Sequence, residues 1–267
     1  MTSERLIISC HQPNFLPYLG FFDKMAQSDV FVIRNEVLFV RKEFHNRNRI
    51  RINSHDNINF PQSKWISVPV HDPQDNIIHV KIKRDFKTKG AFWNEILLKE
   101  IKTHYQRTRY FEDYFPELEE IFDNSHESLI SLNMRIINFI ARAFNIRTKI
   151  ILASNLNLKP KNFEKSDASQ DLANICKALN GKIYLSGEGG KVYLNKIPFE
   201  RENIKVEFQE YKHPVYEQNY PGFQPYMAAI DALFCVGEMP EEKTFGREAS
   251  KTKEEKIPAI CQTQDGL

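Results

Sequence analysis

The sequence places a histidine and two carboxamide side chains directly after its first apolar run. His11, Gln12 and Asn14 follow that run, and prolines stand at positions 13 and 17. A histidine in such a loop could act as a general base or donate a hydrogen bond to an anion. Because proline fixes φ and lacks an N–H group, the loop should be stiff. We predict a functional loop; the alternative is that His11 only caps the following helix.

A second polar segment follows the apolar run at 29–33. Its candidate ligand-binding residues are Asn35, Arg41, Asn46, Arg47, Asn48 and Arg49. Arginine forks suit phosphate or carboxylate groups, and asparagine amides could contact a sugar or a base edge. The second strand would end near Arg34, beside the first loop in a parallel sheet. The alternative is a solvated hairpin face, which is the usual fate of a run of charges.

Two further segments could contribute to a site. Ser186 and Gly187 open a glycine-rich turn after an apolar run, and glycine lets a backbone approach a ligand closely. The turn matches neither the dinucleotide-binding nor the Walker pattern, so a tight strand exit explains it equally well. His213 and Tyr216 lie in a polar and aromatic stretch outside regular structure. His213 could be a second acid or base, or it could be structural.

Alternating strands and helices must position these residues. Strand-like runs at 5–10 and 29–33 flank a helical pattern at 18–27, which is the spacing of a β-α-β unit with parallel strands. Later strands are expected at 148–153, 182–186 and 205–208, and later helices at 169–179 and 226–236. We therefore predict an α/β fold with a Rossmann-like, mostly parallel sheet.

Two insertions interrupt this core. Residues 35–83 are predicted to form an antiparallel insertion, and residues 91–145, with three amphipathic patterns, a helical insertion. Strands of the first insertion are expected near 36–41, 48–52, 64–70 and 78–82. From residue 238 the chain is polar and aperiodic. We therefore expect a single α/β domain over 1–237 and a polar tail over 238–267.

The composition argues against several classes of protein. The net charge of +2 over 267 residues gives no general attraction for nucleic acid or anionic membranes. No apolar stretch of about 18 residues predicts a membrane span, and the first residues lack a signal-peptide layout. The four cysteines show no CxxC spacing, and no zinc motif is present. We expect a cytoplasmic protein with no metal site and no tightly bound cofactor.

The segment at 11–24 resembles the WbqC-like protein family, which occurs in gene clusters for O-antigen and other surface glycans. Further matching segments are 29–32, 46–48, 65–69, 184–187 and 223–237. The chain departs from the family pattern at Asn35-Glu36, where an acidic pair is usual, and at Ala228-Ala229, where Ser-Ile is usual. The resemblance implies a role in surface-glycan or lipopolysaccharide assembly.

The resemblance further implies an enzyme that transfers an acyl or aminoacyl group. The donor would be a phosphopantetheine thioester on a carrier protein, and the acceptor the amine of a nucleotide-linked amino sugar. His11 would serve as the base, and Gln12 and Asn14 would stabilise the oxyanion. Arg41, Arg47 and Arg49 would hold the diphosphate. Other substrate contacts are expected from Tyr18, Asn35, Asn46, Asn48, Ser186, Gly187, His213 and Tyr216.

Two other functions stay open. The loop after the first strand also looks like that of nucleotidylyl transferases and pantothenate synthetase, which would imply ATP-dependent adenylate chemistry. The second histidine of their HxGH signature is absent, because residue 14 is Asn. A non-catalytic module that binds a glycan or a carrier protein would also explain a stiff polar loop.

Overall fold

Five parallel strands form the central sheet, in the order β7-β2-β1-β8-β9. They are β1 Ile7–His11, β2 Val30–Ile33, β7 Lys149–Leu152, β8 Ile183–Ser186 and β9 Lys205–Phe208. The computed structural model describes residues 5–53, 62–71, 75–123, 126–158 and 168–240. The predicted α/β fold is confirmed, and each of the five strands overlaps the run predicted for it.

The first two strands and the helix between them form the predicted β-α-β unit. Helix α1, Leu19–Ala26, joins β1 to β2, and the strands pair from Ile8↔Val30 to His11↔Ile33. All four residues of β2 and the middle three of β1 are buried. This burial on both faces explains why these strands appear in the sequence as continuous apolar runs.

The order of the strands reverses at β1. The chain passes from β1 through β2 to β7 and then returns to place β8 and β9 on the other side of β1. The gap between the carboxyl ends of β1 and β8 is therefore the topological switch point, where open α/β sheets bind ligands. His11 ends β1 and Ser186 ends β8, so two predicted site residues reach this edge.

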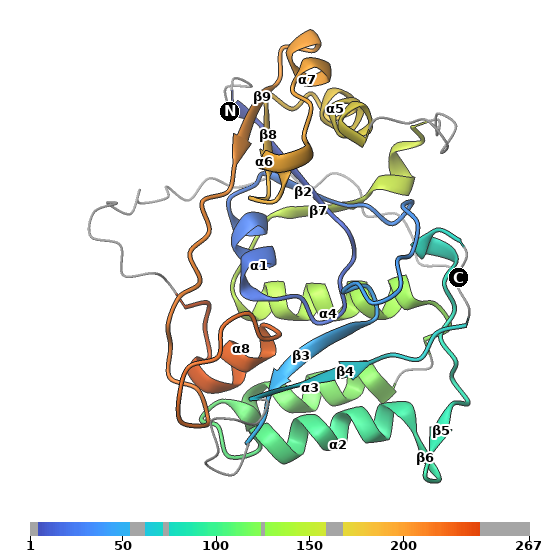
Figure 1. Cartoon of the computed structure of the whole chain (residues 1–267), viewed down its shortest axis with the longest axis vertical. Helices are drawn as coiled ribbons and strands as arrows, with labels where there is room; N and C mark the ends of the chain where they lie inside the picture. The colour runs from blue at the N-terminus through green and yellow to red at the C-terminus, as the bar shows by residue number, and fades with distance from the viewer. Residues whose placement is uncertain (1–4, 54–61, 72–74, 124–125, 159–167, 241–267) are drawn as a thin grey trace, which may run out of the picture.

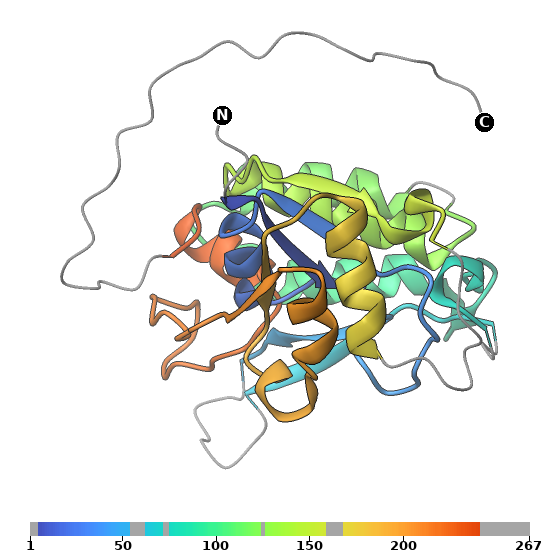
Figure 2. The same ribbon diagram turned by 90° about the horizontal axis from the view of Figure 1, so that it is seen from above.

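Helices cover both faces of the sheet (Figure 1). On one face, α5 (Ala168–Ala178) and α7 (Ile197–Arg201) enclose a core that includes Cys10 and Tyr184. On the other face, α1 and α4 (Leu129–Ala143) enclose a larger core. In the view from above, α5 and α7 lie over the strands (Figure 2). The two helical layers leave the carboxyl edge as the place where polar side chains can gather.

The antiparallel insertion has less strand than predicted. Its ladder joins β3, Arg47–Arg51, to β4, Ser63–Ser67. The segment expected as a strand at 36–41 is a loop with turns, and the segment at 78–82 overlaps the short 3-10 helix η2, Ile77–His79. Isolated bridges such as Leu38↔Asn76 hold these loops together. The alternating apolar residues of these segments therefore lie in irregular loops rather than in a continuous sheet.

The helical insertion is confirmed as three helices. They are α2 Trp93–Tyr105, α3 Phe111–Asp123 and α4, preceded by a small hairpin of β5 (Lys87–Thr88) and β6 (Ala91–Phe92). Ser128 begins α4 by accepting a hydrogen bond from the Ser131 N–H group. Helix α8, Ile230–Val236, starts later than predicted. Tyr226 has φ +59°, in the left-handed region that an α-helix excludes.

The chain carries two more short helices near the end of the sheet. Helix α6, Gly190–Tyr193, follows β8, and α7 follows it.

Residues 241–267, most of the predicted tail, lie outside the described residues. Among the residues that the structure describes, no helix has both the length and the apolar character needed to cross a bilayer.

Candidate functional site

Two buried asparagines hold the loop after β1. The Asn48 side-chain amide, from β3, donates to the carbonyls of Phe15 and Leu16 at 3.3 and 2.6 Å. The Asn133 amide, from α4, donates to the carbonyls of Pro13 and His45 at 2.8 Å each. Leu16 has φ +43°, a strained conformation for a leucine. These contacts favour the stiffness that the two prolines predict for this loop.

His11 ends β1 with its ring edge-on to Phe21, the ring centroids 4.7 Å apart. Its Nδ1 lies 3.0 Å from the Gln12 carbonyl oxygen. Because a carbonyl can only accept, Nδ1 carries the proton and Nε2 is the acceptor. Burial, with a further contribution from the Lys24 charge, lowers the pKa of His11 to about 3. The imidazole is therefore neutral near pH 7.

Gln12 and Asn14 lie in the same loop but have different surroundings. The Gln12 Oε1 atom lies 2.7 Å from Nε2 of His45. The Val40 N–H group donates to Nδ1 of the same ring, so His45 donates through Nε2 to Gln12. Burial lowers the pKa of His45 to about 4, which keeps it neutral as this arrangement requires. Asn14 is buried in the loop.

Lys24 is a candidate site residue that the sequence analysis did not predict. Its Nζ atom donates to the Cys10 carbonyl at 2.9 Å, and the residue is only 4% exposed. Burial lowers the pKa of this ammonium group to about 8. The sequence does contain a signal for the burial of Lys24, because position 24 follows Phe21 by three residues and precedes Met25. A lysine at that position lies on the apolar face of α1.

The glycine-rich turn lies beside this ammonium group. A Cβ atom built on Gly187 would meet only the Lys24 Nζ atom, at 3.9 Å. Ser186 is buried, and its hydroxyl donates to the Gly187 carbonyl at 3.2 Å. Glycine at position 190 leaves room for the Ser186 hydroxyl, because a Cβ there would lie 2.1 Å from the Ser186 Oγ atom. The structure therefore brings Ser186 and Gly187 to the same edge as His11.

The arginines of the hairpin have other contacts. The guanidinium groups of Arg47 and Arg49 lie 4.2 and 5.7 Å from the ring centroid of Trp65. Arg47 also donates to the Lys42 carbonyl, and Arg41 is exposed. Cation–π contacts of this kind hold the two arginines along the β3–β4 ladder. Their predicted contact with a diphosphate stays a prediction.

Several residues predicted to contact the substrate have side chains that are hydrogen-bonded within the protein. The Asn35 amide binds the backbone and hydroxyl of Ser154 at 3.1 and 2.9 Å, which ties the end of β2 to the end of β7. The Asn46 amide donates to the Val68 carbonyl at 2.8 Å. These two side chains, like Asn48, hold backbone segments in place. A substrate could contact these side chains only through polar atoms that these hydrogen bonds do not occupy.

Tyr18, His213 and Tyr216 belong to an aromatic cluster. The His213 ring centroid lies 5.0 Å from that of Tyr226 and 6.3 Å from that of Tyr216, and Tyr18 lies 6.2 Å from Tyr226. The Tyr216 hydroxyl donates to buried Asp231 at 2.7 Å. Burial lowers the pKa of His213, so this ring is also neutral near pH 7. The cluster fixes the segment between β9 and α8.

Comparison with known proteins identifies the family. The model of the WbqC-like protein family matches residues 12–242. The chain belongs to this family. It is also 28% identical, over 240 residues, to the Mycobacterium tuberculosis protein described as uncharacterized protein Rv1507c, covering 89% of this chain and 97% of that protein. No solved structure matches the chain.

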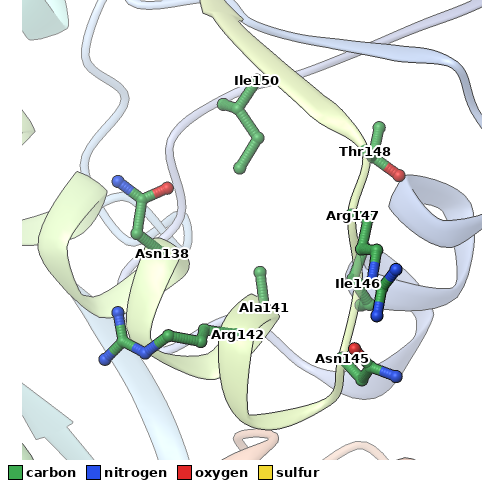
Figure 3. A pocket seen from close by; sticks show the side chains of 8 residues that line it. All are labelled: Asn138, Ala141, Arg142, Asn145, Ile146, Arg147, Thr148 and Ile150. Atoms are coloured by element: carbon green, nitrogen blue, oxygen red, sulfur yellow. The ribbon is translucent and has the colours of Figure 1, made fainter. Parts of the chain in front are cut away.

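This WbqC-like protein has a pocket at the opposite edge of the sheet. A space of about 370 Å³ lies between the end of α4 and the start of β7, where Ala141 and Ile150 point toward each other (Figure 3). Its lining residues are Asn138, Ala141, Arg142, Asn145, Ile146, Arg147, Thr148 and Ile150. None of them is a predicted site residue. The predicted residues His11 and Ser186 lie at the carboxyl edge, away from this pocket.

The carboxyl edge of the WbqC-like sheet combines a cation with a neutral acceptor. Lys24 can bind an anionic group, and Nε2 of His11 can accept a hydrogen bond from an amine or a hydroxyl. In the described ranges, no group of three or more His, Cys, Asp and Glu side chains could hold a metal ion. The Lys24 ammonium group and the His11 imidazole nitrogen are groups of the kind that bind anions and transfer protons.

Proposed function

We propose that this protein transfers an acyl or aminoacyl group from a carrier-protein thioester to the amine of a nucleotide-linked amino sugar. The observation that carries the proposal is the position of His11 at the switch point, where the Lys24 ammonium group binds the carbonyl of the preceding residue, Cys10. A nucleotide-linked substrate offers both an anion and an amine, so it matches both groups. The resemblance to proteins of surface-glycan gene clusters supports O-antigen or a related glycan as the product, made in the cytoplasm.

The proposed reaction needs an uncharged amine. Its nitrogen attacks the thioester carbonyl, the C–N bond forms, the C–S bond breaks, and the amine proton passes through His11 to the departing thiolate. With its pKa near 3, His11 would be a weak base in the free protein. A bound anion beside Lys24 would offset the positive charge that helps to lower this pKa. Substrate binding would therefore raise the basicity of His11 when it is needed.

A second candidate function is nucleotidylyl transfer or adenylate formation. Counting only the strands of the central sheet, the order β7-β2-β1-β8-β9 is 3-2-1-4-5, which matches five strands of the nucleotide-binding Rossmann order. That order suits ATP as well as a nucleotide sugar. A non-catalytic module that binds the same ligands is the remaining alternative.

The test uses the full chain with a panel of nucleotide-linked amino sugars and acyl-pantetheine thioesters, with mass spectrometry to detect the amide. We expect His11→Ala to lower the rate of amide formation about 10²- to 10⁴-fold, the usual contribution of a general base. Circular dichroism should show an unchanged fold. Full activity in His11→Ala would rule out the assigned role.

The same assays separate the alternatives. Release of AMP or pyrophosphate from ATP, with no amide formed from thioesters, would favour the adenylate reaction. Saturable binding of a nucleotide sugar with no product across the panel would favour the binding module. A His11→Gln variant serves as a matched control, because it keeps a hydrogen-bonding side chain but cannot carry a proton at neutral pH.

A further inference from the structure

Lys24 carries a buried ammonium group with no acidic partner in the part of the chain that the structure describes. Its polar contact there is the hydrogen bond to the Cys10 carbonyl, and its nearest ring is Phe31, with the centroid 5.8 Å away. Two acidic residues flank this place in the chain, Asp23 next to Lys24 and Glu188 next to Gly187, and both have other partners. Asp23 accepts from Gln209 and Gln27 at 2.5 and 2.6 Å, and Glu188 pairs with Lys191 at 3.7 Å.

The hydrogen-bond ladder places this ammonium group between β1 and β8. Along β1, the Leu6 carbonyl accepts from β8-side N–H groups, whereas the carbonyls of Ile7 and His11 accept from the β2 side. Because carbonyls alternate along a strand, the Cys10 carbonyl faces β8. The β1–β8 pairing ends at Ser9↔Leu185, so the Lys24 Nζ atom binds Cys10 just beyond the last strand pair.

A buried ammonium group without a carboxylate is costly. Removing a charge from water costs several kcal/mol, which a nearby opposite charge must offset. One carbonyl offsets only part of this cost, and the two nearby titratable groups, Cys10 and His11, are both uncharged near pH 7. Space remains on the side of Gly187, where a Cβ atom would meet nothing within 4 Å except the Nζ atom itself. The site therefore lacks a negative charge and has room for one beside the turn.

We propose that Lys24 binds a phosphate group of the ligand in the space that Gly187 leaves open. The ligand class is a diphosphate, because this crevice is where α/β sheets of this strand order bind nucleotide phosphates. Its identity as the diphosphate of a nucleotide-linked sugar rests on the proposed function. The anion site itself does not depend on any transfer reaction. It assigns phosphate recognition to α1 and the β8 turn instead of the arginines of β3.

The sharpest test supplies the missing charge from within the protein. Gly187→Asp adds a carboxylate next to the Nζ atom, where it should pair with Lys24 and exclude an external anion. Gly189→Asp is the matched control, because it adds the same charge to the same turn, where a Cβ meets nothing within 4 Å. Isothermal titration with inorganic pyrophosphate on the full chain should show binding about tenfold weaker or more in Gly187→Asp. The control should stay within about twofold of wild type, because a carboxylate at this exposed position is screened by solvent and salt.

A second pair of variants tests the lysine itself. Lys24→Met keeps the length of the side chain but not its charge, and Lys24→Arg keeps the charge. We expect Lys24→Met to lose pyrophosphate binding and Lys24→Arg to retain part of it, with folding of both checked by thermal melting. Equal affinity in wild type, Lys24→Met and Gly187→Asp would overturn the proposal, as would the absence of pyrophosphate binding in wild type.

The two proposals can fail separately. Pyrophosphate binding that depends on Lys24, with no amide product from any thioester, would retain the anion site and remove the transferase. Amide formation that is unchanged in Lys24→Met would retain the transferase and remove the anion site. Competition of pyrophosphate with UDP and with ATP then shows which source of the diphosphate the site prefers.

Discussion

The crevice between β1 and β8 and the surroundings of β3 both contain buried polar side chains, but these side chains differ in what they contact. Next to β3, Arg51 is 1% exposed and donates to carbonyls of Ile52, Pro221 and Gly222 and to Gln62. In the crevice, Lys24 is similarly buried and has one carbonyl as its hydrogen-bond partner among the described residues. A guanidinium group with several carbonyl and amide partners stabilises a fold, whereas an ammonium group with one carbonyl partner has donors left for a ligand.

This difference predicts opposite consequences of substitution. Removing a buried, hydrogen-bonded group near β3 should lower the free energy of unfolding, because its buried partners lose their hydrogen bonds. Removing a group in the crevice should lower ligand affinity more than stability. The four predictions below test this contrast in order of expected size.

Asp231→Ala should have the largest effect. This carboxylate is fully buried and accepts from the hydroxyls of Tyr105 and Tyr216 and from the Gln218 amide, at 2.7, 2.7 and 2.8 Å. Its loss removes the shared acceptor of these three donors, so the free energy of unfolding should fall by about 3–4 kcal/mol. Urea denaturation measures this change.

Tyr216→Phe is the matched control for Asp231→Ala. It removes one of the three hydrogen bonds and should cost only about 1 kcal/mol. Equal losses in the two variants would mean that the network is not centred on Asp231. The contrast with the crevice would then lose its strongest example.

Asn48→Ala should have the next largest effect. It leaves the carbonyls of Phe15 and Leu16 without their side-chain donor and frees a loop that holds a strained residue. The free energy of unfolding should fall by about 2 kcal/mol. Hydrogen exchange should rise first in residues 12–18. Unchanged exchange there would show that the prolines, rather than Asn48, keep the loop stiff.

Acidification should destabilise the protein through His11. Its pKa is about 3 when folded and 6.5 when unfolded. Between these values the unfolded chain binds more protons, so stability is complete above pH 6.5 and falls as the pH drops toward 3. At pH 5 the free energy of unfolding should be about 1–2 kcal/mol lower than near neutral pH because of His11. Comparing the pH dependence of urea denaturation for wild type and His11→Phe isolates it.

His45 shifts in the same direction, so some acid sensitivity should remain in His11→Phe. Parallel stability curves for the two proteins between pH 7 and 4 would contradict the burial of His11 as a neutral ring. The crevice would then resemble an exposed loop, and its contrast with the region around β3 would disappear.

The sequence predicted the strands of the central sheet, but not the loops of the first insertion or the contacts around the candidate site. Strands buried on both faces leave continuous apolar runs, which is why β1, β2 and β8 were predictable. The pairing of β1 with β8 joins segments far apart in the chain, and no local pattern encodes it. For the same reason, the partners of Lys24 and Asn48 could not be inferred, because each reaches a segment brought near only by folding.

The arginines of β3 should show the smallest effect. Arg47 and Arg49 stack on Trp65, which is itself 44% exposed, and such contacts contribute about 0.5–1 kcal/mol at an exposed site. Arg47→Ala and Arg49→Ala should each change stability by less than about 1 kcal/mol and pyrophosphate affinity by less than about twofold. Urea denaturation and calorimetric titration measure both. A loss of about tenfold in affinity would instead place the phosphate site on the hairpin, because Lys24 alone would then not explain anion binding.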